Sequence, residues 1–407
     1  MYPILQSMRV IEGSSFVASP SAGLYLAQMG AEVIRFDQIG GGPDFRRWPL
    51  ADNGASLYWE GLNKGKKSVA IDLSRPEGRE LAQRLATAPG DNGGLFLTNY
   101  PEKSFLSHER LAALRADLIT VRVMGMADGG NALDYTVNCA IGIPQITGPD
   151  SLGREPVNHV LPAWDLLTGA YAAFAMLAAE RSRRENGTGR EVRVPLMDIA
   201  TATLSNLGQI AEVLTTGADR ARYGNQVYGA FGRDFVTADG ARIMVMAITP
   251  RQWTGLLDSL GIGEAVARVE AARGVSFAKD EGVRFAHRDA LVPLVADAIA
   301  GRQSAELFAD FDSKAVCWGP YRAMLDAAND PKLVTDNPLF SPIAHPSGLT
   351  YPAAGAPATI PQDDRLAPVR APRLGEHTDQ ILLDVLGLGS GEVGALHDAG
   401  VVAGAEA

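Results

Sequence analysis

The sequence is poor in several features that mark particular classes of protein. Only two cysteines, Cys139 and Cys317, occur among 407 residues. They form no CxxC pair, so we expect neither a disulfide framework nor a zinc site, nor any other bound metal. Cysteine usage of this kind suits thiols in a reducing compartment, and we expect a cytoplasmic protein.

Basic residues are also in the minority. Lysine and arginine number 37 against 47 aspartates and glutamates, which gives a net charge of −10. A nucleic-acid-binding protein normally has a basic face, so nucleic acid is not an expected partner. No apolar run reaches the roughly 18 residues of a membrane span, and the first residues lack the basic and apolar stretches of a signal peptide.

The composition is that of an ordinary globular protein. Hydrophobic residues make up 46% and charged residues 21% of the sequence, which allows a large core. The length favours two domains. In the first third, short apolar segments alternate with segments of helical spacing. Strands are expected at 8–13, 31–37, 67–73, 93–100 and 118–125, and helices at 19–30, 75–87 and 108–116. Such alternation predicts βαβ units and a parallel sheet.

After residue 162 the regular alternation of short strands and helices ends. A long apolar helix is expected at 163–185. A strand at 191–198 and a second long helix at 199–214 are expected to follow it. After it the sequence becomes rich in glycine and aromatic residues, and TADG at 237–240 predicts a hairpin turn.

We therefore expect an α/β fold made of a large domain with a parallel sheet and a smaller α+β domain. The predicted bounds are 1–222 for the first part of the large domain, 223–318 for the small domain, and 319–407 for a return segment that completes the large domain. The proline- and glycine-rich stretch 336–373 reads as an extended crossing segment, and two short helices are expected near the end.

The first turn excludes one obvious ligand. A nicotinamide cofactor needs G-x-G-x-x-G after the first strand, and this chain has GSSFVASPSAG there. Two other stretches leave alternatives open. The glycines at 40–42 are either a flexible turn or a loop beside a ligand. The lysine-rich NKGKKS at 63–68 is either a solvated turn or part of a phosphate-binding site. Arg35, Arg46 and Arg47 could contribute to such a site.

Asp165 stands between Trp164 and the apolar run of the long helix. As a helix cap it would contribute about 0.5–2 kcal/mol relative to alanine. As a carboxylate it could also act as a nucleophile that becomes acylated. Both roles can hold together, because the helix dipole would help to keep it ionised. His159 lies six residues earlier, where it is either structural or part of acid–base machinery; no sequence signature of a histidine-based enzyme accompanies it.

Several segments, taken together and in order, resemble the class III CoA-transferase family, which also contains α-methylacyl-CoA racemases. These are RVIEGSSFVASPSAGLYLAQMGAEVIRFD, GLNKGKKSVAIDLSRPEGRELAQRL, LDYTVN, the Asp165 helix and PRLGEHTDQILLDVLG. The resemblance implies a Rossmann-like large domain, a small domain and an interlocked homodimer. It also implies an acyl-CoA substrate and no cofactor beyond the CoA moiety of that substrate.

The resemblance assigns roles to individual positions. The family nucleophile falls on Asp165. Contacts with CoA fall on Phe16, Val17, Ala18, Leu62, Lys66, Asn99 and Tyr100. Many members have a basic residue at the position of Gln38, so we expect Arg35 or Arg47 to compensate for it.

A narrower resemblance predicts the reaction. GGGPDFRRWP, NHVLPAWD, DYTVN and GNQVYGAFGRDF are similar to a branch that moves CoA between the two carboxylates of one methylated fumarate. That branch implies transfer within a single molecule, through an aspartyl anhydride and an aspartyl thioester. Gly229 and Gly232 are then candidates for shielding the intermediate and supplying N–H donors, Arg233 for binding the free carboxylate, and Tyr135 and His159 for orienting the diacid.

Three alternatives remain at this stage: transfer between two molecules, racemisation, and binding of acyl-CoA without catalysis. The racemase branch has a histidine directly before an aspartate where this chain has Leu133 and Asp134. Proton exchange at a carbon atom needs such a base, so the sequence favours transfer over racemisation.

Overall fold

The computed structural model describes residues 1–405, and they form two compact units. The first unit comprises Met1–Ile141, His159–Thr216 and the chain from Asn329 onward. The second comprises Gly142–Asn158 and Gly217–Ala328. The predicted domain bounds stay a prediction. The two compact units differ from them because 142–158, 217–222 and 319–328 belong to the smaller unit.

A seven-stranded sheet organises the first unit, in the order β12-β3-β2-β1-β4-β5-β6. Its strands are β1 (Arg9–Gly13), β2 (Glu32–Gln38), β3 (Lys67–Ile71), β4 (Leu95–Thr98), β5 (Ile119–Met124), β6 (Arg190–Pro195) and β12 (Val402–Ala403). All neighbours are parallel except β12, which runs antiparallel to β3. The expected mixed α/β fold with a mostly parallel sheet is therefore confirmed.

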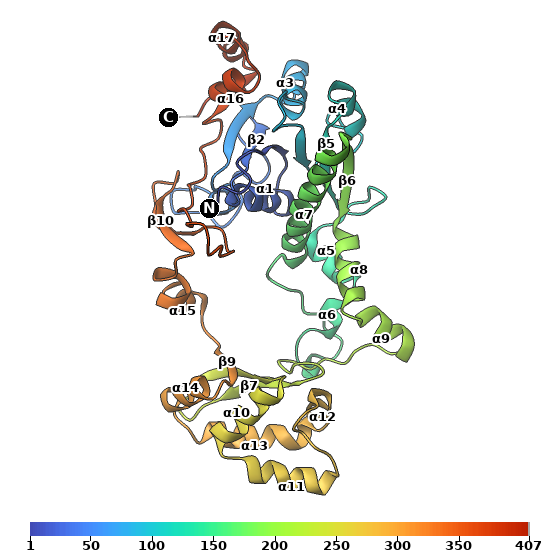
Figure 1. Ribbon diagram of the computed structural model, residues 1–407, viewed down its shortest axis with the longest axis vertical. Helices are drawn as coiled ribbons and strands as arrows, with labels where there is room; N and C mark the ends of the chain where they lie inside the picture. Colours follow the sequence, from blue (N-terminus) through green and yellow to red (C-terminus); the bar gives the residue numbers. More distant parts are fainter. Residues whose placement is uncertain (406–407) are drawn as a thin grey trace. The chain divides into compact units, whose positions relative to one another are not determined.

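Helices cover both faces of this sheet, because each buried strand contributes apolar side chains to both sides. Val10 and Ile11 show the alternation: the first packs with α1, α7 and α8, the second with α3, α4, α16 and α17 (Figure 1). The helices of this unit are α1 (Ala18–Gln28), α2 (Leu57–Leu62), α3 (Pro76–Ala86), α4 (His108–Leu114), α5 (Asp134–Ala140), α7 (Ala163–Asn186), α8 (Leu196–Asn206), α9 (Gln209–Thr216), α16 (Thr378–Asp384) and α17 (Ser390–Asp398), with the π-helical turn Pro331–Thr335.

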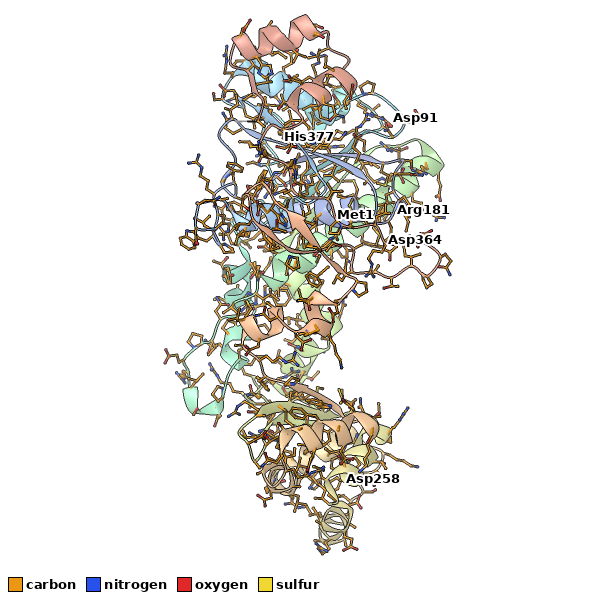
Figure 2. The ribbon with its side chains drawn as sticks, turned by 90° about the vertical axis from the view of Figure 1, so that its left-hand side faces the viewer. Met1, Asp91, Arg181, Asp258, Asp364 and His377 are labelled. Carbon is orange, nitrogen blue, oxygen red and sulfur yellow. The ribbon has the colours of Figure 1, made fainter. Side chains whose placement is uncertain are left out.

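The expected long helix at 199–214 is wrong in one respect, because the chain forms α8 and α9 with a break between them. Gly208 has a φ of +73°, a left-handed conformation that ends α8. The expected extended segment 336–373 contains a hairpin of β10 (Phe340–Ala344) and β11 (Thr350–Ala354). Figure 2 places Met1 and Asp364 near each other, and the Leu366 N–H donates to the Met1 carbonyl at 2.9 Å.

The second unit is a three-stranded antiparallel sheet packed with helices. Its strands are β7 (Phe231–Val236), β8 (Arg242–Ala247) and β9 (Cys317–Pro320), and its helices are α6 (Ile143–Ile146), α10 (Pro250–Leu260), α11 (Gly263–Arg273), α12 (Glu281–Ala286), α13 (Arg288–Ala300), α14 (Ser304–Ser313) and α15 (Met324–Ala328), with the 3-10 turn Asp150–Leu152. The predicted hairpin turn is present: the Gly240 N–H donates to the Thr237 carbonyl at 3.0 Å. The unit has its own core around Phe231, Trp253 and Phe311.

Candidate active site

The first turn of α7 presents Asp165 as its third residue. Amide groups in a first turn have no partner within the helix. The Asp165 N–H is satisfied from outside, because it donates to Oδ2 of Asp134 at 2.9 Å. The N-cap residue is Pro162, which makes no side-chain cap. The prediction that Asp165 is the cap residue of this helix is therefore wrong. The acceptor for the Asp165 N–H comes from Asp134, at the start of α5.

Asp134 connects the nucleophile candidate to two other predicted residues. Its carboxylate is 2% exposed, and its second oxygen, Oδ1, lies 2.5 Å from Nε2 of His159. The His159 ring meets the Tyr135 ring edge-on, with 5.5 Å between centroids. The structure thus brings Asp165, His159 and Tyr135 together through Asp134, a residue that sequence reasoning considered only in relation to racemases.

The surroundings of Asp165 perturb its acidity. Burial, reinforced by the negative charge of Asp134 and opposed by Arg47, raises the pKa of its carboxyl to about 6. The helix dipole was expected to favour the ionised form, but desolvation outweighs it. With a pKa of about 6, the group is still mostly ionised at pH 7 and remains able to attack a carbonyl carbon.

Arg47, which acts on Asp165, also contacts two aromatic rings. Its guanidinium lies 5.4 Å from the centre of the Phe16 ring and 5.5 Å from that of Tyr58. The Tyr58 hydroxyl is buried and has no hydrogen-bond partner among the described residues. Burial, followed by the opposed effects of nearby charges that include Asp165, raises the Tyr58 pKa above its usual value. The phenol is therefore a neutral donor that lacks an acceptor.

The loop after β1 holds Phe16 in a strained conformation. Phe16 has a φ of +69°, unusual for a residue with a side chain. Its N–H donates to Asp44 at 3.1 Å, and the preceding Ser15 exchanges two hydrogen bonds with the Asn99 side chain, at 2.9 and 3.2 Å. Strain of this kind persists only where the surroundings hold it, and it clusters at functional sites.

This loop lies at the topological switch point of the sheet. The strand order reverses between β1 and β4, and ligands of doubly wound sheets bind outside the carboxyl ends of the strands at such a point. The predicted CoA contacts Phe16, Asn99 and Tyr100 follow these two strands. Asn99, Tyr100 and Lys103 line a cavity of about 450 Å³ there, a size that suits part of a large ligand.

The remaining predicted CoA contacts differ in accessibility. Val17 and Ala18 are 8% and 5% exposed, so only their backbone is suited to a ligand. Leu62 is half-buried at the end of α2. Gln38 is engaged elsewhere: its amide donates to Asp72 at 3.0 Å and accepts from the Leu73 N–H at 2.8 Å. The contacts of all these residues with CoA stay predictions.

Arg35 and Lys66 lie inside the protein instead of facing solvent. Arg35 is 1% exposed and pairs with Asp37 and Asp44 at 2.8 and 2.9 Å. Lys66 is 3% exposed and pairs with Glu12 at 2.8 Å. Both positive charges are therefore already neutralised, which leaves neither side chain available to grip a phosphate. Arg47 keeps its charge at the surface, beside Phe16.

The predicted residues of the second unit form a local group. Gly229 has a φ of +80°, and the Gly232 carbonyl accepts from the Val227 N–H at 2.8 Å. The Arg233 guanidinium lies beside Asp234, with its Nη2 3.5 Å from Oδ1. Their contribution to the site around Asp165 stays a prediction.

Close packing fixes the direction of α7. A Cβ atom on Gly169 would come within 2.1 Å of the Ser21 hydroxyl and 2.6 Å of the Ala18 carbonyl of α1. Only glycine allows the two helices to approach so closely. The Trp164 indole N–H also donates to Asn138 of α5 at 3.0 Å. Two helices, α1 and α5, thus hold the N-terminal part of α7 in place.

Comparison with known proteins identifies the family. The family model described as CoA-transferase family III matches residues 5–378. The chain belongs to CoA-transferase family III. The 2-methylfumaryl-CoA isomerase of Chloroflexus aurantiacus is 48% identical over 406 residues, which cover 99% of each chain.

More distant members agree with this assignment. A succinate–glutarate CoA-transferase of Agrobacterium fabrum is 29% identical and covers 94% of this chain and 96% of its own. The crystal structure of a CAIB/BAIF family protein from Brucella suis has a TM-score of 0.74 at 26% identity, covering 94% of this chain and 99% of the other.

Residues 1–405 contain neither a membrane-spanning helix nor a group of metal ligands. None of the described helices combines the length and apolar character that crossing a membrane requires. Within the same residues, no three side chains of histidine, cysteine, aspartate or glutamate are grouped so as to hold a metal ion.

Proposed function

We propose that this member of CoA-transferase family III converts 2-methylfumaryl-CoA into 3-methylfumaryl-CoA by moving CoA from one carboxylate of the substrate to the other. The observation that carries the proposal is the 48% identity, over 99% of both chains, to a 2-methylfumaryl-CoA isomerase. The placement of Asp165 supports it, because this half-buried carboxylate stands in the first turn of a helix and interacts electrostatically with Arg47 and Tyr58.

The first half of the reaction opens the thioester. An Asp165 oxygen attacks the C1 carbonyl carbon, the carbon–sulfur bond breaks, and CoA leaves as a thiolate, which gives a mixed anhydride. The thiolate then attacks the Asp165 carbonyl carbon. The anhydride breaks into an aspartyl-CoA thioester and a free C1 carboxylate, which keeps one oxygen atom from Asp165.

The second half repeats these steps at the other end of the diacid. A C4 carboxylate oxygen attacks the aspartyl thioester, releases the thiolate and forms a second anhydride. The thiolate attacks the C4 carbonyl carbon and leaves Asp165 as a carboxylate that now holds one oxygen from C4. Holding the diacid in place makes each encounter an internal step, with effective molarities of about 10⁵–10⁸ M.

Named side chains have distinct tasks in this scheme. Each attack creates an oxyanion, and we expect the buried Tyr58 hydroxyl to donate to a substrate oxygen, because it lacks a partner among the described residues. Tyr135 orients the diacid next to Asp165. For Gly229 and Gly232 the roles implied by the resemblance are those of backbone donors, and for Arg233 that of a binder of the free carboxylate. No cofactor takes part beyond the CoA moiety of the substrate.

Oxygen-18 tests the scheme directly. In a single turnover with substrate labelled in its free C4 carboxylate, the Asp165 peptide gains one oxygen-18 atom, which mass spectrometry detects. The Asp165→Asn variant gives the background. Product formed without label at Asp165 would exclude the acylation route. Loss of turnover with retained CoA binding in Asp165→Ala separates an enzyme from a simple binder.

A mixing experiment separates internal from external transfer. Unlabelled 2-methylfumarate is added in excess to carbon-13-labelled 2-methylfumaryl-CoA. Internal transfer keeps the label in the CoA esters. Scrambling of label into the free acid would instead assign the chain to the intermolecular transferases, the activity in the name of the Agrobacterium relative.

Racemisation is a second candidate, and one contact favours it. His159 reaches Asp134 although residue 133, where racemases have histidine, is leucine. We expect no exchange at the α-carbon, because residue 133 is leucine and the histidine that racemases use as a base at that position is missing. Incubation of a 2-methylacyl-CoA in deuterium oxide decides the matter, since only a racemase incorporates deuterium at that carbon.

We also propose that the protein works as a homodimer in the cytoplasm. The α7 surface supports a second copy of the chain as a partner. Leu167, Tyr171 and Phe174 are 40%, 50% and 61% exposed, and their spacing puts them on neighbouring turns of one helix. Sedimentation of the wild type and of Phe174→Glu tests the assignment; a wild type that sediments as a monomer would contradict it.

A further inference from the structure

The Asp134 carboxylate carries a negative charge that is not needed to accept a hydrogen bond from the first turn of α7. One oxygen accepts from the Asp165 N–H at 2.9 Å, and the other contacts His159 at 2.5 Å. The carboxylate is 2% exposed, so water does little to screen its charge. A serine or threonine would satisfy the same N–H without a charge. Here a buried negative charge stands next to the residue that must itself be negative to react.

We propose that Asp134 and His159 are positioning residues of the acylation reaction: Asp134 fixes the first turn of α7 and keeps a negative charge beside the nucleophile, and His159 sets how much of that charge remains. The inference deepens the proposed function and rests on it, because it takes Asp165 as the acylated group. Neither residue touches the reacting atoms in this scheme.

The charge of Asp134 favours acylation for a simple reason. It raises the free energy of Asp165 only while Asp165 is a carboxylate. Protonation removes that repulsion, and so does conversion to an anhydride or a thioester, since both are neutral at Asp165. The interaction that makes the carboxylate more basic therefore also shifts the acyl-transfer equilibrium towards the acylated enzyme. Each pH unit by which the pKa rises corresponds to about a tenfold shift.

The protonation state of His159 determines how much of the Asp134 charge remains. A neutral imidazole that donates to Asp134 leaves the negative charge in place, whereas an imidazolium cancels it. The His159 ring is held in its contact by Tyr135, whose ring meets it edge-on. The other charged or titratable groups that act on Asp165 are Arg47, which lowers its pKa, and Tyr58 on α2. Neither contacts the Asp134 carboxylate through an observed hydrogen bond.

The decisive measurement is the titration of Asp165 itself. Carboxyl carbons are labelled with carbon-13, the Asp165 signal is assigned by its absence in Asp165→Asn, and the titration is followed by NMR without substrate. Asp134→Asn keeps an acceptor for the Asp165 N–H but removes the charge. We expect the Asp165 titration to move down by about one pH unit. An unmoved titration in a folded variant would overturn the inference.

His159→Gln gives the opposite expectation. Glutamine donates to Asp134 but never carries a positive charge, so the Asp165 titration moves up. The double variant titrates like Asp134→Asn, because His159 acts only through Asp134. A downward shift or no shift in His159→Gln would remove His159 from the assignment. Since His159 is only partly buried, this variant tests the inference even if Asp134→Asn fails to fold.

A matched pair elsewhere in the same unit provides the control. His397 Nε2 contacts Asp379 Oδ1 at 2.7 Å, near the surface. The variants Asp379→Asn and His397→Gln remove a contact of the same kind, and the Asp165 titration stays in place in both. A shift in these controls would show that the method reports a general change, and would overturn the assignment.

The functional readout keeps the two proposals distinguishable. After rapid quenching, the ratio of acylated to free Asp165 in Asp134→Asn is about tenfold lower for every pH unit by which the titration has moved down. If 2-methylfumaryl-CoA is not isomerised but the titration of Asp165 responds as expected, the proposed substrate is wrong and the positioning role stands. If isomerisation proceeds through Asp165 and the titration of Asp165 does not respond to the change at Asp134, only the positioning role is wrong and the proposed function stands.

Discussion

Replacing Asp165 by asparagine should abolish acyl transfer and at the same time stabilise the protein. The fold raises the pKa of this carboxyl from 3.8 to about 6. That difference is roughly two pH units, each worth about 1.4 kcal/mol. Keeping Asp165 ionised therefore costs the folded state up to about 3 kcal/mol. Because the side chain is half-buried, water screens part of the effect, and we expect a gain of about 1–3 kcal/mol in Asp165→Asn at pH 7.5.

The pH dependence gives this prediction its sign. A carboxyl whose pKa is higher in the folded state destabilises the fold only when it is ionised. The cost is complete above about pH 6, falls to about half at pH 5, and is absent below the unfolded pKa of 3.8. The advantage of Asp165→Asn over the wild type must therefore shrink as the pH falls from 7.5 to 5.

Thermal and urea denaturation at pH 7.5 and pH 5, at equal protein concentration, measure the effect. For a chain of this size the expected increase in melting temperature at pH 7.5 is about 1–4 °C. The exposed Asp198 of α8 provides a control, since Asp198→Asn makes the same chemical change without burial. If Asp165→Asn is no more stable than the wild type at pH 7.5, or if its advantage is the same at pH 5, the reasoning about burial is refuted.

Three further changes test other parts of the site. Gly169→Ala places a methyl group 2.1 Å from the Ser21 hydroxyl, and we expect it to destabilise the protein by about 1–3 kcal/mol in urea denaturation and to slow acylation. Tyr58→Phe removes a buried hydroxyl that lacks a partner among the described residues, so turnover should fall by about 10²-fold while stability is unchanged or rises by about 1 kcal/mol. Lys66→Met leaves Glu12 buried without its lysine, and should cost about 3–5 kcal/mol in the same denaturation assay. Unchanged turnover in Tyr58→Phe, or unchanged stability in either of the other two, would contradict the respective assignment.

The strands and helices of the parallel sheet were predictable because each shows its period over several residues. The short apolar runs at 31–37 and 118–125 became β2 and β5. In contrast, β12 has only two residues, Val402 and Ala403, and so brief a strand has no period to detect. The break between α8 and α9 depends on one glycine in an otherwise helical pattern, which propensity alone tolerates.

The chemistry of the site was only partly accessible from the sequence. Asp165 could be named from the resemblance, but its altered acidity depends on Asp134, which lies 31 positions earlier in the chain and contacts it only after folding. The charge of Arg35 in an apolar strand seemed suited to a phosphate. Its burial against Asp37 and Asp44 is a property of the packed interior, for which local sequence gives no signal.

The antiparallel pairing of β12 with β3 has a consequence for how the protein is made. The edge of β3 is covered by Val402 and Ala403, which follow β3 by more than 300 positions in the chain. Ser68, also in β3, exchanges hydrogen bonds with His377, which Figure 2 labels. During synthesis this edge of β3 therefore stays without its partner strand until the residues between β3 and β12 have been added. An unpaired strand edge readily recruits other strands. Chaperones that hold such intermediates should raise the yield of this protein most strongly in a variant that lacks β12.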